Sequence, residues 1–197
     1  MQKLLVVVAL LAAGQAEAED AWSKEPTAYR GVEWGSSYEA AEEKLITGPR
    51  SVPIKCVCHA DNGAPVMCVA ILNPAGMRCT SGFSIDTVRI TDAFSFDRDA
   101  FAAAQMEFDS DAYGFLKDIF IEKYGQPHKL ESTTFKTLGG LEAQNESLAW
   151  TGARVVIQLS RYGDSITRGS ATISTTAHIK ILAEREERTK KNGAGAF

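Results

Sequence analysis

The chain has 197 residues, of which 45% are hydrophobic and 23% charged, and its formal net charge is -4. This length and apolar content suffice for one domain with a substantial core, or for two small repeats. Lysine and arginine are scattered through a mildly acidic chain, which argues against nucleic acid or an anionic membrane surface as a partner.

Residues 1–18 have the pattern of a secretory signal peptide. Lys3 precedes an apolar run at 4–13, and Ala16 and Ala18 have the spacing that a signal peptidase accepts. The run is about ten residues long, whereas roughly 20 are needed to span a bilayer. We therefore expect cleavage after Ala16 or Ala18, a periplasmic or secreted location, and no transmembrane segment in the mature chain.

A polar leader at residues 19–28 precedes the first predicted helix. Ser36 opens a capping box of the form S-x-x-E, which predicts a short helix that ends at about Thr47, ahead of a Gly-Pro pair. The apolar face of this helix is formed by Tyr38, Ala41 and Leu45.

Residues 52–72 are predicted to form a hairpin. A two-residue turn at Asn62 and Gly63 would divide the apolar positions between the two faces of the hairpin. A five-residue loop centred on Gly63 keeps them on one face, pairs residue 58 with residue 68, and leaves Pro65 outside the ladder. We expect the register centred on Gly63.

The next stretch is predicted as a loop at 73–82 and a strand at 85–96, with Val88 and Ile90 facing inward. Residues 100–108 are ambiguous, because three consecutive alanines favour a helix. Turn-like residues at 97–99 and a fresh capping signal at 109–111 bound the stretch on both sides.

Residues 109–127 are predicted to form the central helix. Asp109 or Ser110 would cap its first amides, and Gly125 followed by Pro127 would end it. Its apolar stripe consists of Tyr113, Leu116, Phe120 and Tyr124. The opposite face, with Lys117, Asp118, Glu122 and Lys123, is interpreted as a solvated surface.

Beyond the central helix the pattern changes to strands. Alternating apolar and polar residues predict strands at 129–138, 141–150, 154–160 and 170–176. Opposite charges four residues apart then predict an exposed helix at 178–191. The ion pairs expected on it are Glu184 with Arg188, Glu186 with Lys190, and Glu187 with Lys191.

Three short sequences carry a resemblance to known proteins: GVEWG at 31–35, KYGQP at 123–127, and Trp150 ahead of VVIQL at 155–159. With them the chain resembles, over about residues 29–178, a family of small, functionally uncharacterised secreted proteins of Gram-negative bacteria. The resemblance implies that 100–108 is a strand hairpinned to 85–96, and we therefore expect a strand there. The cysteines between 56 and 79 are not part of that pattern.

The expected fold class is α+β, with helices packed on an antiparallel sheet. It would consist of two helix-then-strand units, at 29–108 and 109–177, and a charged helical tail at 178–197. This order looks like the repeat in secreted β-lactamase inhibitors and in outer-membrane assembly lipoproteins. A shared topology does not carry function.

The four cysteines and His59 form the one cluster in the sequence whose side chains could form covalent bonds or bind a metal. An even cysteine count in an exported chain predicts disulfides, and four cysteines allow three pairings. We expect Cys58 with Cys68, and Cys56 with Cys79. The rival pairing, Cys56 with Cys68 and Cys58 with Cys79, needs a hairpin centred on Asn62. A redox-active thiol pair or a zinc or copper site are further alternatives, although the spacing lacks the C-x2-C pairs of known zinc sites.

The sequence contains no G-x-S-x-G, no H-E-x-x-H and no phosphate-binding glycine loop. His128 and His178 are expected to be surface residues and not ligands, and we expect no enzymatic activity, cofactor or metal. The leading hypothesis is a non-catalytic periplasmic protein that binds another envelope or secreted protein, as an inhibitor, immunity factor or envelope-assembly accessory. One alternative is a module for a small ligand or lipid. The other is a thiol or metal protein that uses the region from Cys56 to Cys79.

Overall fold

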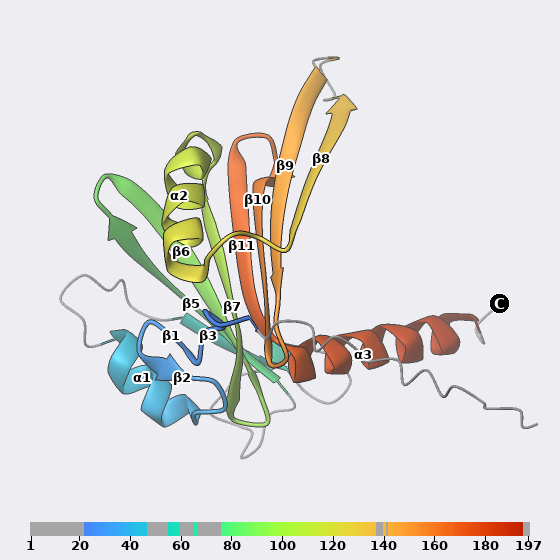
Figure 1. Ribbon diagram of the computed structural model, residues 1–197. Coiled ribbons are helices and arrows are strands. Elements are labelled where there is room, and N and C mark those ends of the chain that lie inside the picture. Colours follow the sequence, from blue (N-terminus) through green and yellow to red (C-terminus); the bar gives the residue numbers. More distant parts are fainter. Residues whose placement is uncertain are drawn as a thin grey trace, which may run out of the picture.

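The computed structural model describes residues 22–46, 55–59, 65–66, 76–136, 140 and 142–194. The predicted signal peptide lies outside these ranges. The helices are α1 (Tyr38–Ile46), α2 (Tyr113–Tyr124) and α3 (Thr176–Ala194) (Figure 1). The strands are β1 (Ala28–Tyr29), β2 (Val32–Glu33), β3 (Lys55–His59), β4 (Pro65–Val66), β5 (Gly76–Ile85), β6 (Val88–Asp97), β7 (Ala100–Asp109), β8 (Lys129–Lys136), β9 (Glu142–Thr151), β10 (Val155–Ser165) and β11 (Arg168–Thr175).

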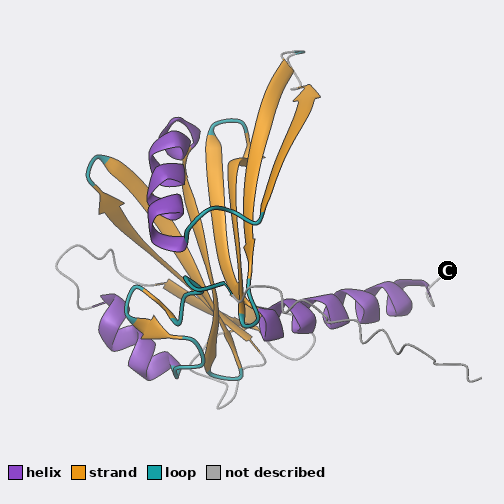
Figure 2. Cartoon of the chain, viewed as in Figure 1, coloured by secondary structure: helices purple, strands orange, loops and turns teal. Residues whose placement is uncertain are grey.

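One large antiparallel sheet dominates the described part of the chain (Figure 2). Its strand order is β4-β3-β5-β6-β7-β11-β10-β9-β8, and β1 pairs with β2 in a separate short ribbon. At the centre of the sheet β7 pairs with β11, where Ala104 lies opposite Ile173. The mixed α+β class, the antiparallel sheet and the C-terminal helix are thereby confirmed.

Helix α2 packs on the sheet through the predicted stripe, since all four of its residues, Tyr113, Leu116, Phe120 and Tyr124, are buried. Gly125 ends the helix with a φ of 84°, a conformation that glycine adopts without strain. The predicted N-cap is wrong, because neither Asp109 nor Ala112 makes a side-chain cap. The Ser110 hydroxyl instead donates to the Ile166 carbonyl, in the β10–β11 turn, at 2.8 Å.

Trp150 on β9 lies at the centre of the core, with no exposed surface. Its ring centroid is 6.1 Å from that of Phe120 and 6.4 Å from that of Tyr124. Its indole Nε1 donates a 2.8 Å hydrogen bond to the Gly125 carbonyl, just past the end of α2. This residue thus fixes α2 to the sheet through both packing and a polar contact.

Helix α1 is capped by residues other than the one predicted. The Ser37 hydroxyl, and not that of Ser36, accepts from the Ala40 amide at 3.3 Å. The Asp99 carboxylate, from the turn between β6 and β7, accepts from the Tyr38 amide at 2.9 Å. A distant turn therefore satisfies an amide that a local capping box would otherwise bind.

The strands of the first half correct two predictions and confirm a third. The predicted loop at 73–82 contains most of strand β5, and Ile85 ends β5 at a turn with Asp86 at a φ of 52°. The predicted strand at 100–108 is confirmed as β7, because Ala102, Ala103 and Ala104 are all buried within the sheet. Here the environment of the strand overrides the helix propensity of alanine.

The register predicted for the 52–72 hairpin is wrong. Cys58 pairs with Val66, and His59 with Pro65, which centres the hairpin on Asn62. Pro65 therefore lies in the ladder. β4 is the last strand of the sheet, and an edge position tolerates a residue without an amide hydrogen.

The charged tail forms α3, which extends away from the sheet (Figure 1). The Lys190 ammonium and the Glu186 carboxylate are 2.6 Å apart, which confirms one of the expected i,i+4 pairs. The Arg188 guanidinium donates to the Glu184 backbone carbonyl and not to its carboxylate.

Gly169 on β11 is buried against the ring of Phe108 on β7. An added Cβ would lie 2.7 Å from Cζ and 2.9 Å from Cδ2 of that ring. Gly169→Ala is therefore expected to lower the free energy of unfolding by about 1–3 kcal/mol, measured by urea denaturation. Adding Phe108→Leu should restore part of this loss.

The matched control for this prediction is Gly114→Ala in α2, where an added Cβ meets nothing within 4 Å. Alanine is the better helix former by about 1 kcal/mol, so this change should be neutral or stabilising. Equal effects of Gly114→Ala and Gly169→Ala would contradict the packing of Gly169 against Phe108.

Candidate functional site

A buried ion pair lies beneath the β1–β2 turn. The turn consists of Arg30 and Gly31, both with positive φ, and it directs the Arg30 guanidinium onto β6. There it contacts the Asp92 carboxylate at 2.7 Å and lies 4.4 Å from the centre of the Phe83 ring. The Tyr29 hydroxyl donates to the same carboxylate oxygen at 3.3 Å.

Asp92 has no exposed surface, and its second oxygen, Oδ1, has no hydrogen-bond partner. Burial raises the pKa of Asp92, although the neighbouring Arg30 opposes this shift. Burial likewise raises the pKa of Tyr29 well above its usual value, with a further rise from the charge on Asp92. Structural ion pairs also shift pKa values, and because Arg30 and Tyr29 both bind the Asp92 carboxylate we interpret this cluster as structural.

A second charged cluster joins α2 to β9. Glu146 accepts from Lys117 Nζ at 2.6 Å and from the Tyr113 hydroxyl at 2.9 Å. The hydrogen bond from Lys117 lowers the pKa of Glu146, while burial raises that of Tyr113. The prediction that Lys117 belongs to a solvated surface is therefore wrong, because its side chain is half-buried and paired.

The sheet face opposite α2 carries two rows of side chains that run across five strands. Strand alternation and the observed register define these rows, which we call the open face. One row consists of Thr91, Glu107, Ser170, Ser160 and Ser147. The other consists of Ala93, Gln105, Thr172, Gln158 and Ala149.

The open face is polar but almost uncharged, since Glu107 is the one ionisable residue among its ten side chains. A shallow hollow of about 100 Å³ lies at its margin, between Glu107, Ser170 and the β10–β11 turn. This volume is well below the roughly 300–1,000 Å³ of typical small-molecule sites. Beside the hollow, Arg168 is paired with Asp109 at 3.5 Å.

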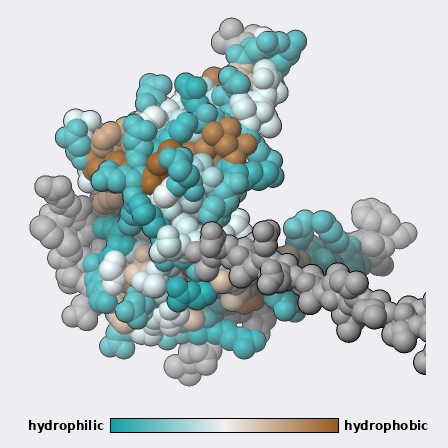
Figure 3. Space-filling view, viewed as in Figure 1, coloured by the Kyte–Doolittle hydropathy of each residue, from teal (hydrophilic) through white to brown (hydrophobic). Residues whose placement is uncertain are grey.

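The α2 side of the molecule differs from the open face in that it exposes large hydrophobic side chains. Hydrophobic groups there are separated by hydrophilic ones (Figure 3). Phe115, Leu130 and Ile166 are the exposed large hydrophobic residues of α2, β8 and the β10–β11 turn. Single exposed hydrophobic residues are normal on soluble proteins, so they do not mark a site.

The predicted disulfide residues are only partly placed. Cys56 on β3 lies directly opposite Cys79 on β5, whereas Cys58 lies opposite Met77. Cys68 lies outside the described residues. The backbone register thus brings together one of the two predicted pairs.

The two later histidines have different surroundings. His128 is exposed, as predicted, and its Nδ1 accepts from the Thr151 amide at 2.9 Å. His178 is buried, and its Nδ1 lies 2.7 Å from the Asp97 carboxylate. The prediction that His178 is a surface residue is wrong, because the first turn of α3 packs against the end of β6.

Within the ranges given above, no three His, Cys, Asp or Glu residues are grouped so as to hold a metal ion. None of the helices in those ranges has the length and apolar character needed to cross a membrane. No protein-family model matches the chain, and neither the curated proteins nor the solved structures contain a match to it.

Proposed function

We propose that the chain is an exported, non-catalytic protein that binds another envelope or secreted protein through its open face. In this proposal residues 1–18 are removed on export to the periplasm, as in the secreted family that the chain resembles. The body consists of two helix-then-strand units, 29–108 and 109–177, joined edge to edge at β7 and β11. An inhibitor, an immunity factor and an envelope-assembly accessory all fit this function.

The observation that carries the proposal is the scarcity of charge on the open face. The solvent-facing surface of a protein is typically about 25–35% charged, whereas the centre of a protein interface is depleted of charge. Only Glu107 is charged among the ten open-face residues, of which Ala93 and Ser160 are buried. The two rows continue on β8 to Glu131 and Lys129, which form an ion pair with each other at the margin of this face. The hydroxyl, amide and methyl groups of this face lie on paired strands, which would hold them in place for a partner.

The test compares capture from an envelope extract by the wild type, by a Glu107→Arg/Gln158→Arg variant and by an Asp118→Arg control. Glu107 and Gln158 are exposed on the open face, and Asp118 is exposed on α2. We expect the open-face variant to lose a partner that the wild type and the control retain. Equal capture by all three proteins, or no capture by any, would count against docking at this face.

Export predicts a particular mass for the mature protein. When the full-length gene is expressed in a Gram-negative host, the periplasmic product should begin after Ala16 or Ala18 and should carry no lipid. Intact-mass measurement checks both points. Exported material that retains Met1 would contradict the proposed signal peptide.

Export also predicts a disulfide between Cys56 and Cys79, whereas the hairpin register centred on Asn62 removes the basis for the expected bond between Cys58 and Cys68. Directly opposite residues on antiparallel strands have Cα atoms about 4.5–5.5 Å apart, within the range that a disulfide spans. This bond should stabilise the protein by roughly 2–4 kcal/mol. Non-reducing peptide mapping of the wild type and of Cys58→Ala should show the bond from Cys56 to Cys79 in both. Four free thiols in exported protein would contradict the prediction.

A further inference from the structure

The N-terminal strap, residues 22–26, is bound to parts of the chain far from it in sequence. Trp22 Nε1 donates to the Tyr124 carbonyl at 2.8 Å, and Lys24 Nζ donates to the Glu122 carbonyl at 2.9 Å. These carbonyls belong to the last turn of α2, where backbone oxygens lack helical partners. The Trp22 ring also packs edge-on against Tyr124 and His128, with ring centroids 6.4 Å and 5.5 Å away.

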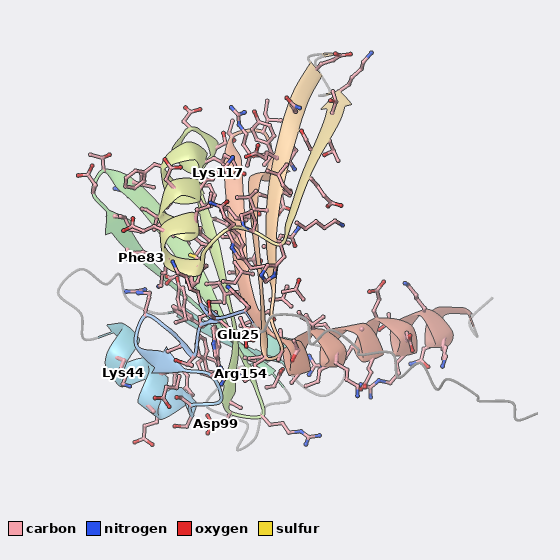
Figure 4. The ribbon with its side chains drawn as sticks, in the orientation of Figure 1. Glu25, Lys44, Phe83, Asp99, Lys117 and Arg154 are labelled. Carbon is pink, nitrogen blue, oxygen red and sulfur yellow. The ribbon has the colours of Figure 1, made fainter. Side chains whose placement is uncertain are left out.

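Glu25, the fourth residue of the strap, occupies an anion site in the turn between β9 and β10. Its Oε1 accepts from the Arg154 amide at 2.6 Å and from the Val155 amide at 2.8 Å. The Arg154 guanidinium lies 3.8 Å from Oε2, and the Glu25 side chain is only 12% exposed. Figure 4 shows Glu25 and Arg154 close together beside the start of α3.

Gly152 has no Cβ and therefore leaves space in this turn for the Glu25 carboxylate. A Cβ at this position would lie 2.6 Å from the Glu25 carboxyl carbon and 2.9 Å from the Trp22 ring. Two amides, one guanidinium and a glycine that leaves room for an approaching acid are the parts of a carboxylate site. Trp22 lies beside this site and adds an aromatic anchor three residues before the acid.

We propose that the β9–β10 turn is a carboxylate-binding site, which Glu25 fills and which also takes a peptide with tryptophan three residues before glutamate. The strap is the competing occupant, and its tether gives it an effective concentration in the millimolar range, so it excludes a dilute peptide. A peptide therefore binds only when the strap is displaced. The site contains no open-face residue, so the inference does not rest on the proposed function.

The test uses the full chain and the labelled peptide acetyl-Trp-Ser-Lys-Glu-Pro-amide, with binding followed by fluorescence anisotropy. The double variant Trp22→Ala/Glu25→Ala leaves the site empty, and we call it the vacated variant. The thermal melting curve of this variant shows whether the protein is folded. We expect the vacated variant to bind the peptide at least about tenfold more tightly than the wild type does. Ser23→Ala, in the same strap, should behave like the wild type because no described contact involves that side chain.

Two further arms test the chemistry of the site. The peptide with glutamine in place of glutamate should bind the vacated variant at least about tenfold more weakly, because hydrogen bonds to a charged acceptor are the stronger ones. Adding Gly152→Ala to the vacated variant should abolish binding, because the new Cβ fills the space of the carboxylate. Equal binding of the two peptides, or no binding by the folded variant, would overturn the proposal.

A second measurement leaves the strap sequence intact. Gly152→Ala alone should force the strap off its site and speed tryptic cleavage after Lys24 at least about tenfold, since proteolysis follows the population of the open form. The control Gly114→Ala should be cleaved at the wild-type rate. An unchanged cleavage rate in Gly152→Ala would overturn the proposed geometry even if the vacated variant does not fold.

Discussion

Replacing Arg30 by methionine is expected to lower the free energy of unfolding by about 3–5 kcal/mol, the usual result of leaving a buried charge without its partner. Asp92 has no exposed surface and relies on Arg30 as its one described cationic partner. Methionine keeps an apolar side chain over the Phe83 ring, so the loss reports mainly on the charge. Urea denaturation at pH 7 measures the effect.

The ion pair should be asymmetric, which supplies the control. The Arg30 side chain is 27% exposed and can reach water when its partner is removed, whereas Asp92 cannot. Asp92→Asn should therefore cost less than Arg30→Met, and the double variant should recover much of the stability that Arg30→Met loses. A double variant as unstable as the sum of the two single changes would contradict this account.

The same carboxyl gives the stability a pH dependence with a definite sign. Because burial raises the pKa of Asp92 in the folded state above its ordinary value of 3.8, the folded protein binds more protons than the unfolded chain just above that value. The contribution of Asp92 to stability is therefore greatest in acid and falls as the pH rises through the raised pKa. Asp92→Asn should lack this decline, which denaturation at a series of pH values will show.

Replacing Trp150 by alanine is expected to lower the free energy of unfolding by about 3–5 kcal/mol. The change empties a fully buried site beneath α2 and leaves the Gly125 carbonyl without its indole donor. Trp150→Phe keeps most of the packing against Phe120 and Tyr124 but also loses the hydrogen bond, so it should cost clearly less. Equal losses in the two variants would place the stabilisation in the hydrogen bond instead of the packing.

The elements that could be predicted from the sequence are those in which a local pattern and the tertiary environment agree. Helix α2 has a stripe of 3.6-residue period and a terminal glycine, and both act within the helix itself. Strand β7 needed the family resemblance, because its alanines favour a helix and only the neighbours β6 and β11 impose a strand. Strand β5 was missed because the sequence of residues 73–82 is rich in turn formers.

The polar contacts were the hardest part to predict. The pairs Arg30 with Asp92, Lys117 with Glu146, and Glu25 with the amide of Val155 each join residues far apart in the chain. No periodicity or spacing indicates such pairs, because they depend on how the strands are ordered in the sheet. Arg30 did carry one local signal, since a charged residue beside a glycine between two short apolar stretches suggests a tight turn.

The pairing of β7 with β11 at the centre of the sheet affects how the chain folds. Ala104 pairs with Ile173, so the centre of the sheet closes through residues that are distant in sequence. Such non-local pairing slows folding, because the entropy of closing the intervening chain is lost before the contacts form. Until the ribosome has made β11, the earlier strands expose the edge of β7 to other chains. We expect the nascent protein to depend on a chaperone that keeps the edge of β7 from pairing with other chains until synthesis is nearly complete.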